Sequence, residues 1–408
     1  MREEDTSQLE VKYGLPREVV YCRKCVISNQ RPMTTLETVH RSGEAKPTMA
    51  FNEDGVCDAC RWAEIKETRI DWAAREAELL ALCDRFRSAD GRYDVIVPSS
   101  GGKDSGYVAH ILKHKYGMHP LTVTWAPHLY TDIGWKNFQA LIHVGFDNML
   151  FHPNGRMHRL LTRLAFLNLG HPFQPFIFGQ RNIAPSYALK YGVKLVFYGE
   201  NVAEYTNRLE DNYNPQMDKK YYTNLDIGNP DTMISGVSIR ELQERYGVTY
   251  HDLLPYASPA RADIDQAGIE FHYMSYYRKW VPQDNYYYAV ENCGFKANDE
   301  RTQGSYSKHS GIDDRMEYYH YHCMLAKFGM GRATWDAAQE VRSGKITREE
   351  GVALVRKYDC EFPSKYLKDF LEYCEIDEET YHRTIDGLRS PHLWRQVDGH
   401  WALRHPVS

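Results

Sequence analysis

The stretch Tyr93-Asp-Val-Ile-Val-Pro-Ser-Ser-Gly-Gly-Lys-Asp-Ser105 decides the fold of this chain. Its β-branched run at residues 95–97 predicts a short buried strand, which we expect to stop at Pro98 because proline cannot donate to a sheet ladder. Two glycines then allow backbone N–H groups to close around an anion, and a helical pattern follows at residues 106–116. A strand, a glycine turn and a helix start together predict a phosphate-binding loop, since the helix dipole favours an anion there.

This loop differs from the common ATPase loop, whose pattern is G-x-x-x-x-G-K-[ST]. Here Asp104 follows Lys103. An acidic side chain in a phosphate loop is costly unless it has a task, such as holding a magnesium ion. The alternative is an ordinary strand-to-helix turn with chance glycines. The stretch resembles the pyrophosphate loop (PP-loop) of the ATP pyrophosphatases, with the signature S-G-G-x-D-S, which implies cleavage of ATP between its α- and β-phosphates.

The overall composition is that of an ordinary globular protein. The 408 residues are 42% apolar and 26% charged, with a formal net charge of −5. A negative chain has no general attraction to nucleic acid, no apolar run reaches membrane-spanning length, and the first residues lack the apolar core of a secretion signal. We therefore expect a cytoplasmic protein of more than one domain that binds neither nucleic acid nor a membrane. In that reducing compartment, the nine cysteines are not expected to form disulfides.

Four of the cysteines form two pairs with the spacing of metal-binding knuckles. Cys22 and Cys25 are followed, after 31 intervening residues, by Cys57 and Cys60. Each C-x2-C pair directs two thiolates at one point, and four thiolates in a tetrahedral array suit Zn²⁺. An iron–sulfur cluster is the rival metal group; a redox dithiol needs only one pair, and buried free cysteines would not be expected to pair twice. We expect one structural Zn²⁺ that ties the N-terminal segment to the sheet domain.

Strands and helices alternate after the central loop. Further strands are expected at residues 121–125, 148–151, 193–198 and 269–274. Helices are expected at residues 62–86, 135–144 and 156–170, with another ending near residue 191 after an irregular stretch at 171–180. This order predicts an α/β fold with a doubly wound parallel sheet. Residues 202–260 are polar and rich in turn signals, which indicates an insertion with short helices.

We divide the chain into three parts. Residues 1–88 form an N-terminal zinc-binding segment and helix, 89–275 an ATP-binding domain with its insertion, and 276–408 an aromatic-rich, helical C-terminal region. The tyrosines and tryptophan at 276–288 could stack a base or sugar, although packing on the sheet edge explains most of them. A capping box at residues 347–350 predicts a helix that ends at Tyr358.

Polar residues at strand ends are the remaining candidates for a site. Gly199, Glu200 and Asn201 follow the strand at 193–198, and the carboxyl ends of parallel strands form a ligand crevice. The alternative for Glu200 is a solvated loop charge. Asp313 and Asp314 precede a helix predicted at residues 317–328, so that either one could cap it, or both could hold magnesium.

Several stretches together resemble the N-acetyl sugar amidotransferases of bacterial surface-polysaccharide pathways. They are residues 21–26, 52–60 and 100–105, Leu129-Tyr-Thr-Asp-Ile-Gly134, Phe178-Gly-Gln180, Tyr198-Gly-Glu-Asn201, Lys327-Phe-Gly-Met-Gly-Arg-Ala-Thr334 and Ile346-Thr-Arg-Glu-Glu350. The resemblance runs from about residue 21 to about residue 370. Residues 205–265 and the last thirty or so carry less of the pattern, and substrate choice is expected there.

The resemblance implies an ATP-dependent amidotransferase with a PP-loop fold of the adenine nucleotide alpha hydrolase type. Its reaction would convert an acetamido group on a nucleotide sugar into an acetamidino group for surface polysaccharide such as O-antigen, with ATP, Mg²⁺ and a structural Zn²⁺ as cofactors. Lys103 and Asp104 would be catalytic. The implied ATP-binding residues are Ser99, Ser100, Gly101, Gly102, Lys103, Asp104, Ser105, Gly199, Glu200 and Asn201. The candidate substrate-binding residues are Tyr130, Thr131, Asp132, Gln180, Glu204, Asp313 and Asp314.

The resemblance also implies two partner subunits, a glutaminase and a cyclase-like subunit similar to those of histidine biosynthesis, which supply ammonia. The unpaired cysteines agree, since none has a glycine-flanked elbow: Cys83, Cys293, Cys323, Cys360 and Cys374. Two other functions stay open. A PP-loop tRNA-thiolating enzyme would show a basic face and a catalytic cysteine near ATP, and a zinc-dependent binding module would hold ATP without turning it over.

Overall fold

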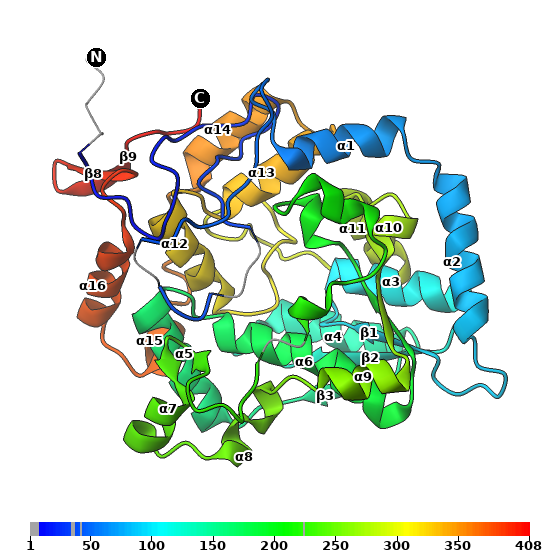
Figure 1. The fold of residues 1–408 in the computed structure, drawn as a ribbon. Helices are drawn as coiled ribbons and strands as arrows, with labels where there is room; N and C mark the ends of the chain where they lie inside the picture. The colour runs from blue at the N-terminus through cyan, green and yellow to red at the C-terminus, as the bar shows by residue number, and fades with distance from the viewer. Residues whose placement is uncertain (1–7, 34–36, 41–42, 223–224) are drawn as a thin grey trace.

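The structure, a computed structural model, describes residues 8–33, 37–40, 43–222 and 225–408. At its centre is a five-stranded, wholly parallel sheet with the strand order β3-β2-β1-β4-β7 (Figure 1). The strands are β1 (Val95–Pro98), β2 (Pro120–Trp125), β3 (Asn148–Phe151), β4 (Leu195–Tyr198) and β7 (Glu270–Tyr273). The expected α/β fold with a parallel sheet is thus confirmed, with strand ends within two residues of those predicted.

Strand β1 does not stop before its proline. Pro98 pairs in register with Val123 of β2, and the next residue, Ser99, donates its N–H to the carbonyl of Val123 at 2.9 Å. Proline removes only its own donor, so the ladder continues through its neighbours. The strand therefore ends at Pro98, as predicted, with the proline as its last residue.

Helices cover both faces of the sheet. One face packs on α2 (Trp72–Phe86), α3 (Lys103–His114) and α4 (Asp132–His143), and the other on α5 (Gly155–Leu169) and α6 (Gln174–Tyr191). Successive strand residues point to opposite faces, so Val95 and Val97 join the first core while Ile96 joins the second. This two-sided burial explains why the strands read as continuous apolar runs.

The sheet reverses its order at β1. The chain adds β2 and then β3 on one side of β1, and adds β4 and then β7 on the other. Loops that leave the carboxyl ends of β1 and β4 therefore diverge to opposite faces and open a crevice between them.

Two helix predictions were wrong in detail. The pattern at residues 62–86 forms two helices, α1 (Asp58–Thr68) and α2, because Asp71 caps α2 by accepting N–H bonds from Ala73 and Ala74, each at 3.0 Å. The stretch at 171–180 is largely helical, since α6 begins at Gln174. Pro175 lies in the first turn, where no N–H bond is required.

The predicted insertion consists of short elements, as expected. They are η1 (Val202–Glu204), η2 (Leu209–Tyr213), η3 (Lys219–Tyr221), β5 (Met233–Ile234), β6 (Val237–Ser238), α7 (Ile239–Tyr246), α8 (Tyr250–Leu253) and η4 (Leu254–Tyr256). Next come α9 (Arg261–Ala267), α10 (Met274–Tyr277) and α11 (Pro282–Asn292). In the aromatic stretch, Tyr277 and Trp280 are buried in the core under the sheet, whereas Tyr287 is 55% exposed.

The C-terminal region is mostly helical, with one hairpin that the sequence did not suggest. Its elements are α12 (Glu317–Phe328), α13 (Arg332–Arg342), α14 (Arg348–Tyr358), α15 (Leu367–Cys374), α16 (Glu378–Leu388), β8 (Trp394–Val397) and β9 (His400–Leu403). The capping box at Thr347 and Glu350 is confirmed. The N-terminal segment lies beside this region and shares a core with it (Figure 1).

Candidate active site

The loop between β1 and α3 is held in one shape by a serine and a glycine. The Ser99 hydroxyl donates to Ser105 Oγ at 2.9 Å and accepts the N–H of Gly101 at 3.4 Å. Gly101 has φ +86°, and a Cβ there would lie 2.5 Å from Cα of Phe138. No side chain among the described residues caps α3, which starts directly after Gly102, so its first N–H groups stay open to an anion.

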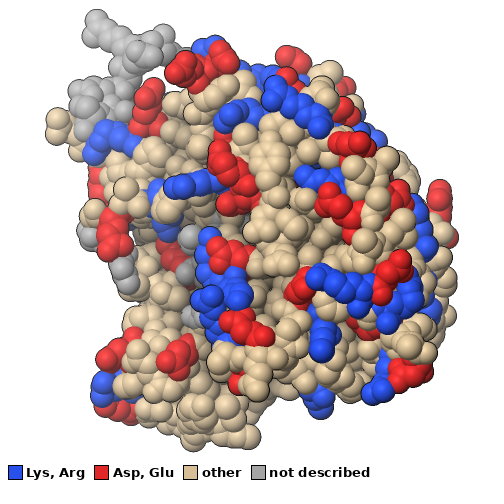
Figure 2. Space-filling model, turned by 45° about the vertical axis from the view of Figure 1, so that its right-hand side comes forward, with Lys and Arg blue, Asp and Glu red and all other residues tan. Residues whose placement is uncertain are grey.

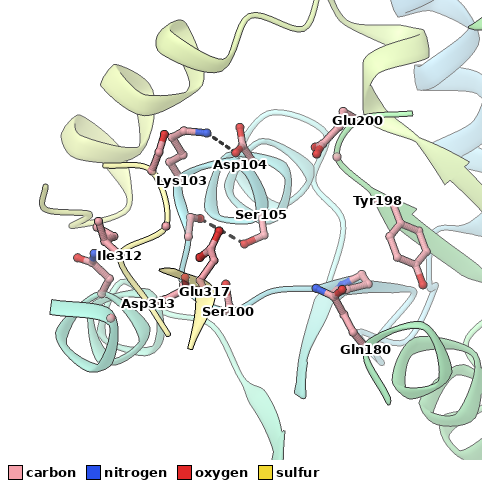
Figure 3. A pocket seen from close by; sticks show the side chains of 18 of the residues that line it. Ser100, Lys103, Asp104, Ser105, Gln180, Tyr198, Glu200, Ile312, Asp313 and Glu317 are labelled. Carbon is pink, nitrogen blue, oxygen red and sulfur yellow. Dashed lines mark hydrogen bonds and ion pairs between the residues drawn. The ribbon is translucent and has the colours of Figure 1, made fainter. Parts of the chain in front are cut away.

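Lys103 and Asp104 begin α3 and form an ion pair with each other. Asn285 of α11 also donates to Oδ1 of Asp104, at 3.2 Å. Both charged side chains line the same cavity (Figure 3). The loop thus combines open N–H groups with one cation and one carboxylate, which suits a phosphate group accompanied by a metal ion.

A cavity of about 520 Å³ lies over the loop at the carboxyl ends of β1 and β4, where the sheet reverses its order. Its walls come from the loop, the residues after β4, helix α6 and the segment 309–317. In Figure 3, Tyr198 and Gln180 lie across the pocket from Lys103 and Asp313. The size is typical of small-molecule sites, which are roughly 300–1,000 Å³.

Many residues proposed from the sequence line this cavity. They are Ser100, Gly101, Gly102, Lys103, Asp104, Ser105, Gln180, Gly199, Glu200 and Asp313. The structure therefore brings the residues after β1 together with those after β4, and adds Gln180 from α6.

Three other proposed residues, Ser99, Asn201 and Glu204, make hydrogen bonds outside the cavity. Ser99 bonds within the loop, as described above. The backbone N–H of Asn201 donates to Ser275 Oγ at 2.9 Å, and its side-chain amide donates to the carbonyl of Asp211 at 3.0 Å. Glu204 accepts from Trp62 Nε1 at 3.1 Å and pairs with Lys66. Glu204 thus holds the chain after β4 against α1, and none of the three residues lines the cavity.

The remaining proposed residues lie at the start of α4, where Thr131 contacts the backbone of Asp313. Thr131 caps α4 by accepting the N–H of Gly134 at 2.9 Å, and its own N–H donates to the carbonyl of Asp313 at 3.1 Å. Tyr130 forms an isolated bridge with Asp314, and Asp132 is exposed in the first turn of α4. The backbone carbonyl of Asp313 therefore lies against the start of α4, and Asp313 itself lines the cavity.

The adjacent carboxylates Asp313 and Asp314 face different partners. Asp314 accepts from Nδ1 of His128 at 2.7 Å and from the His128 N–H at 2.8 Å, in the protein interior. It also accepts from the N–H of Met316, the N-cap residue of α12. Asp313 instead lines the cavity, and burial raises its pKa.

Several pocket residues were not proposed from the sequence. They are Arg181, Tyr198, Tyr221, Tyr273, His309, Glu317 and Arg332. Glu317 accepts from Nη1 of Arg332 at 2.7 Å. Tyr198 and Arg332 fall inside stretches that carry the family resemblance, which was the available signal, whereas nothing in the spacing pointed to the others.

Two glutamates in this pocket, Glu200 and Glu317, hold their protons more tightly than usual. Burial raises the pKa of Glu200 to about 7, and the nearby Asp104 carboxylate adds to the shift. Burial also raises the pKa of Glu317 to about 7, against the opposing effect of Arg332. Burial lowers the pKa of His309 to about 4. Carboxyl groups that titrate near neutral pH are suited to proton transfer or to binding a cation.

The four paired cysteines form a separate metal centre. Cys22, Cys25, Cys57 and Cys60 are buried, and their sulfur atoms all lie within 4.8 Å of one another. Two of the S···S distances, Cys22–Cys60 and Cys25–Cys57, are 3.8 Å. A tetrahedron with Zn–S bonds of about 2.3 Å has edges of about 3.8 Å, so the group fits a single Zn²⁺. A multi-iron cluster would need its thiolates further apart.

Backbone and charge complete this centre. The N–H groups of Lys24, Cys25 and Cys57 point at Sγ of Cys22, at 3.4 to 3.5 Å. Arg342 of α13 reaches Sγ of Cys25 at 4.0 Å, which offsets the negative charge of four thiolates.

The position of the metal centre corrects one expectation. Its cysteines share a core with α12, α13 and α14, so a metal ties the N-terminal segment mainly to the C-terminal helices. The N-terminal segment contacts the sheet domain through α1, where Trp62 donates a hydrogen bond to Glu204 and Lys66 forms an ion pair with it.

The molecule is therefore a mixed α/β protein with a loop-lined pocket at the switch point of a parallel sheet and a tetrathiolate centre that could hold a metal such as zinc. Residues 304–406 match the family model described as "LPS biosynthesis protein WbpG-like, C-terminal domain". That segment forms α12 to α16, the β8–β9 hairpin and, through Glu317 and Arg332, part of the pocket wall. The match supports a role in bacterial polysaccharide biosynthesis. A search among curated proteins gives no match.

Two surface properties bear on possible partners. In the described part of the chain, no helix has the length and apolar character needed to cross a membrane. On the face in Figure 2, Lys and Arg side chains are interspersed with Asp and Glu, whereas a nucleic-acid-binding face would be mainly basic.

Proposed function

We propose that this chain is an ATP-dependent N-acetyl sugar amidotransferase with a PP-loop fold. It would transfer AMP to the acetamido oxygen of a nucleotide sugar and replace that oxygen with ammonia. The observation that carries this proposal is the glycine loop of residues 99–102, which enters α3 at the switch point of the sheet beneath a cavity of about 520 Å³. The polysaccharide match of residues 304–406, which include part of the cavity wall, supports a sugar as the second substrate.

In the first step, the acetamido oxygen attacks the α-phosphorus of ATP. A new O–P bond forms, the bond from that phosphorus to the bridging oxygen breaks, and pyrophosphate leaves with the electron pair. The open N–H groups at the start of α3 and the Lys103 ammonium are suited to stabilise the charge that develops on pyrophosphate. Asp104 and Glu200 would hold Mg²⁺, whose charge would neutralise phosphate charge and offset the burial and the Asp104 repulsion that raise the Glu200 pKa.

In the second step, ammonia adds to the activated carbon and AMP leaves as the amidine forms. The nitrogen must lose a proton as this happens. We assign that proton to Glu317, because its carboxyl lines the cavity and burial raises its pKa to about 7, near the working pH of a general base.

The ammonia would come from a glutaminase subunit, delivered with a cyclase-like subunit. A glutaminase of the cysteine type needs a reactive thiolate, and the unpaired buried cysteines do not provide one. Burial raises the pKa of the thiol in Cys83, Cys293 and Cys323 to about 12, and raises that of Cys374 as well. Exposed Cys360 lacks a nucleophile elbow.

The alternative function, tRNA thiolation, would need a reactive cysteine beside the loop. Cys293 is the nearest candidate, because its Sγ lies 3.6 Å from the point where a Cβ on Gly106 of α3 would sit. It is only 4% exposed, and burial raises its pKa to about 12. The mixed charges of the face in Figure 2 also give this alternative no support.

The test combines the purified chain with ATP, ammonium and candidate nucleotide sugars. We expect AMP and a sugar product that is lighter by about one dalton and carries an added positive charge, as mass spectrometry would show. The rate should rise with pH because ammonia, not ammonium, is the nucleophile. AMP formation without any change in sugar mass would remove the amidotransferase assignment.

Glutamine provides the second arm of the test. The isolated chain should give no product with glutamine as sole nitrogen source, and addition of the two partner subunits should restore it. Efficient use of glutamine by the chain alone would remove the two-partner scheme while leaving the ATP chemistry intact.

A further inference from the structure

One cation in the pocket has no acidic partner. Three lysine and arginine residues line the cavity, of which Lys103 pairs with Asp104, and Arg332 pairs with Glu317 at 2.7 Å. Arg181 of α6 has no carboxylate partner among the described residues. Its charge faces phenols instead, from Tyr198, Tyr221 and Tyr273.

These three tyrosines converge on Arg181 from separate parts of the fold. Tyr198 ends β4 and is paired in register with Tyr273, which ends the adjacent β7, so both rings leave the sheet on the same face. Tyr221 comes from the insertion, and its ring centroid lies 5.5 Å from the Arg181 guanidinium carbon. Asn207 fixes that ring by donating to its hydroxyl at 2.7 Å.

Arg181 and these three tyrosines form one wall of the pocket, called here the Arg181 wall, and one hydroxyl in it makes no hydrogen bond to the described part of the chain. The Tyr198 hydroxyl is buried and has no partner among the described residues. Burial lowers the pKa of Arg181, so its charged form is costly in this wall. Arg181 is only partly buried, but a cation that is withdrawn from water without a counterion is still destabilised, and an anionic ligand compensates for this cost. The planar guanidinium fork matches phosphate oxygens, while tyrosine rings cover a base or a sugar.

The wall lies away from the phosphate loop. Tyr198, whose phenol lies near the Arg181 charge, stands across the pocket from Lys103 and Asp313 (Figure 3). An anion held by Arg181 is therefore separate from one held by the loop. The proposed reaction needs two phosphate-bearing substrates, and this pocket offers one anion-binding wall for each.

We propose that Arg181, with Tyr198, Tyr221 and Tyr273, binds the diphosphate of a nucleoside-diphosphate-linked sugar while the loop binds ATP. This inference rests on the proposed function and adds the site of its second substrate. The sugar then extends from the Arg181 wall toward the loop, which directs its acetamido group at the α-phosphate of ATP.

The experiment is calorimetric titration of UDP, GDP and dTDP into the full chain saturated with a non-hydrolysable ATP analogue. Wild type should bind at least one of them. Arg181→Gln should weaken that binding by about tenfold or more, the usual effect of losing a charge-assisted contact, and Arg181→Lys should weaken it less. Affinity for the ATP analogue alone should stay within about twofold. Arg156→Gln, an exposed arginine on α5, is the matched control and should change neither.

Three results would overturn the inference. They are wild-type protein that binds none of the diphosphates, Arg181→Gln protein that loses the ATP analogue equally, and diphosphate binding that is unaffected by the substitution. Thermal melting confirms that each variant is folded. Because binding is measured without turnover, diphosphate binding that depends on Arg181 in a protein that makes no acetamidino product would support this site and reject the proposed reaction.

Discussion

Glu317 of α12 accepts a hydrogen bond from Arg332 of α13, with Oε1 and Nη1 2.7 Å apart, in the wall of the ligand pocket. Both residues come from the segment that matches the polysaccharide-biosynthesis family model, yet they meet the loop that follows β1, some two hundred residues earlier in the chain. The pocket is thus a joint product of the sheet domain and the C-terminal helices.

Substitution Glu317→Gln should change how stability depends on pH. Burial raises the Glu317 pKa from its ordinary 4.5 to about 7, so between these values the folded protein binds more protons than the unfolded chain. The stabilisation from this group is complete below about pH 4.5 and is lost as pH rises through about 7. The wild-type free energy of unfolding should therefore fall more between pH 5 and 7 than that of the variant. Urea titrations at several pH values measure this. The exposed control Glu244→Gln should follow wild type, and parallel curves for Glu317→Gln and wild type would refute the assignment.

The two loop glycines should respond differently to alanine. Gly101 has φ +86° and no room beside Phe138, so Gly101→Ala should cost about 2 kcal/mol or more of stability. A Cβ on Gly102 meets only Ser100 Oγ, at 3.4 Å, so Gly102→Ala should melt near wild type and instead weaken ATP binding by crowding the phosphates. Thermal melts and ATP-analogue titrations separate these effects. Gly155→Ala, where nothing lies within 4 Å, is the control. Equal melting temperatures for the two loop variants would contradict this account.

Lys103→Ala and Asp104→Ala should each lower AMP formation by about 100-fold or more while the fold stays intact. The lysine would stabilise charge on the leaving pyrophosphate, and the aspartate would hold the metal ion, effects that typically contribute this much to rate. Chromatographic measurement of AMP, with circular dichroism as the fold check, tests this. Lys136→Ala, an exposed lysine on α4, should keep wild-type rates. Full turnover by Asp104→Ala would end the metal-binding role.

Cys25→Ser should remove the metal. Metal analysis should find about one zinc per wild-type chain and much less in the variant, with a melting temperature lower by several degrees because structural zinc contributes directly to folding. The control is Cys360→Ser, which alters an exposed cysteine outside the cluster and should change neither value. Brown protein with iron and sulfide would reject zinc and favour the thiolation alternative.

The parts predicted best are those set by local sequence. The strand β1, the glycine turn, helix α3 and the capping box of α14 each depend on residues a few positions apart. The cysteine pairs likewise carry their own geometry, so their convergence followed from the spacing alone. In these cases, local propensity and tertiary packing favour the same structure.

The missed parts depend on contacts between distant residues. Asp313 and Asp314 are neighbours, but one reaches the pocket and the other pairs with His128, because the chain bends at Asp313 and the two side chains point in different directions. His309 and Tyr221 enter the pocket only through the packing of remote segments. The break between α1 and α2 was overlooked because the apolar spacing runs through Asp71, whose capping role is a local signal.

Helix α13 joins two centres that would otherwise be independent. Arg342 at its end lies 4.0 Å from the sulfur of Cys25, and Arg332 at its start holds Glu317 in the pocket wall. The helix has 11 residues, so its two end residues lie about 15 Å apart along the helix axis. A metal bound by the four thiolates would therefore fix the Arg342 end of α13, while the Arg332 end of the same helix forms part of the pocket wall. For the proposed amidotransferase, we expect that oxidation or chelation at the cysteines lowers activity even though none of the four cysteines lines the pocket.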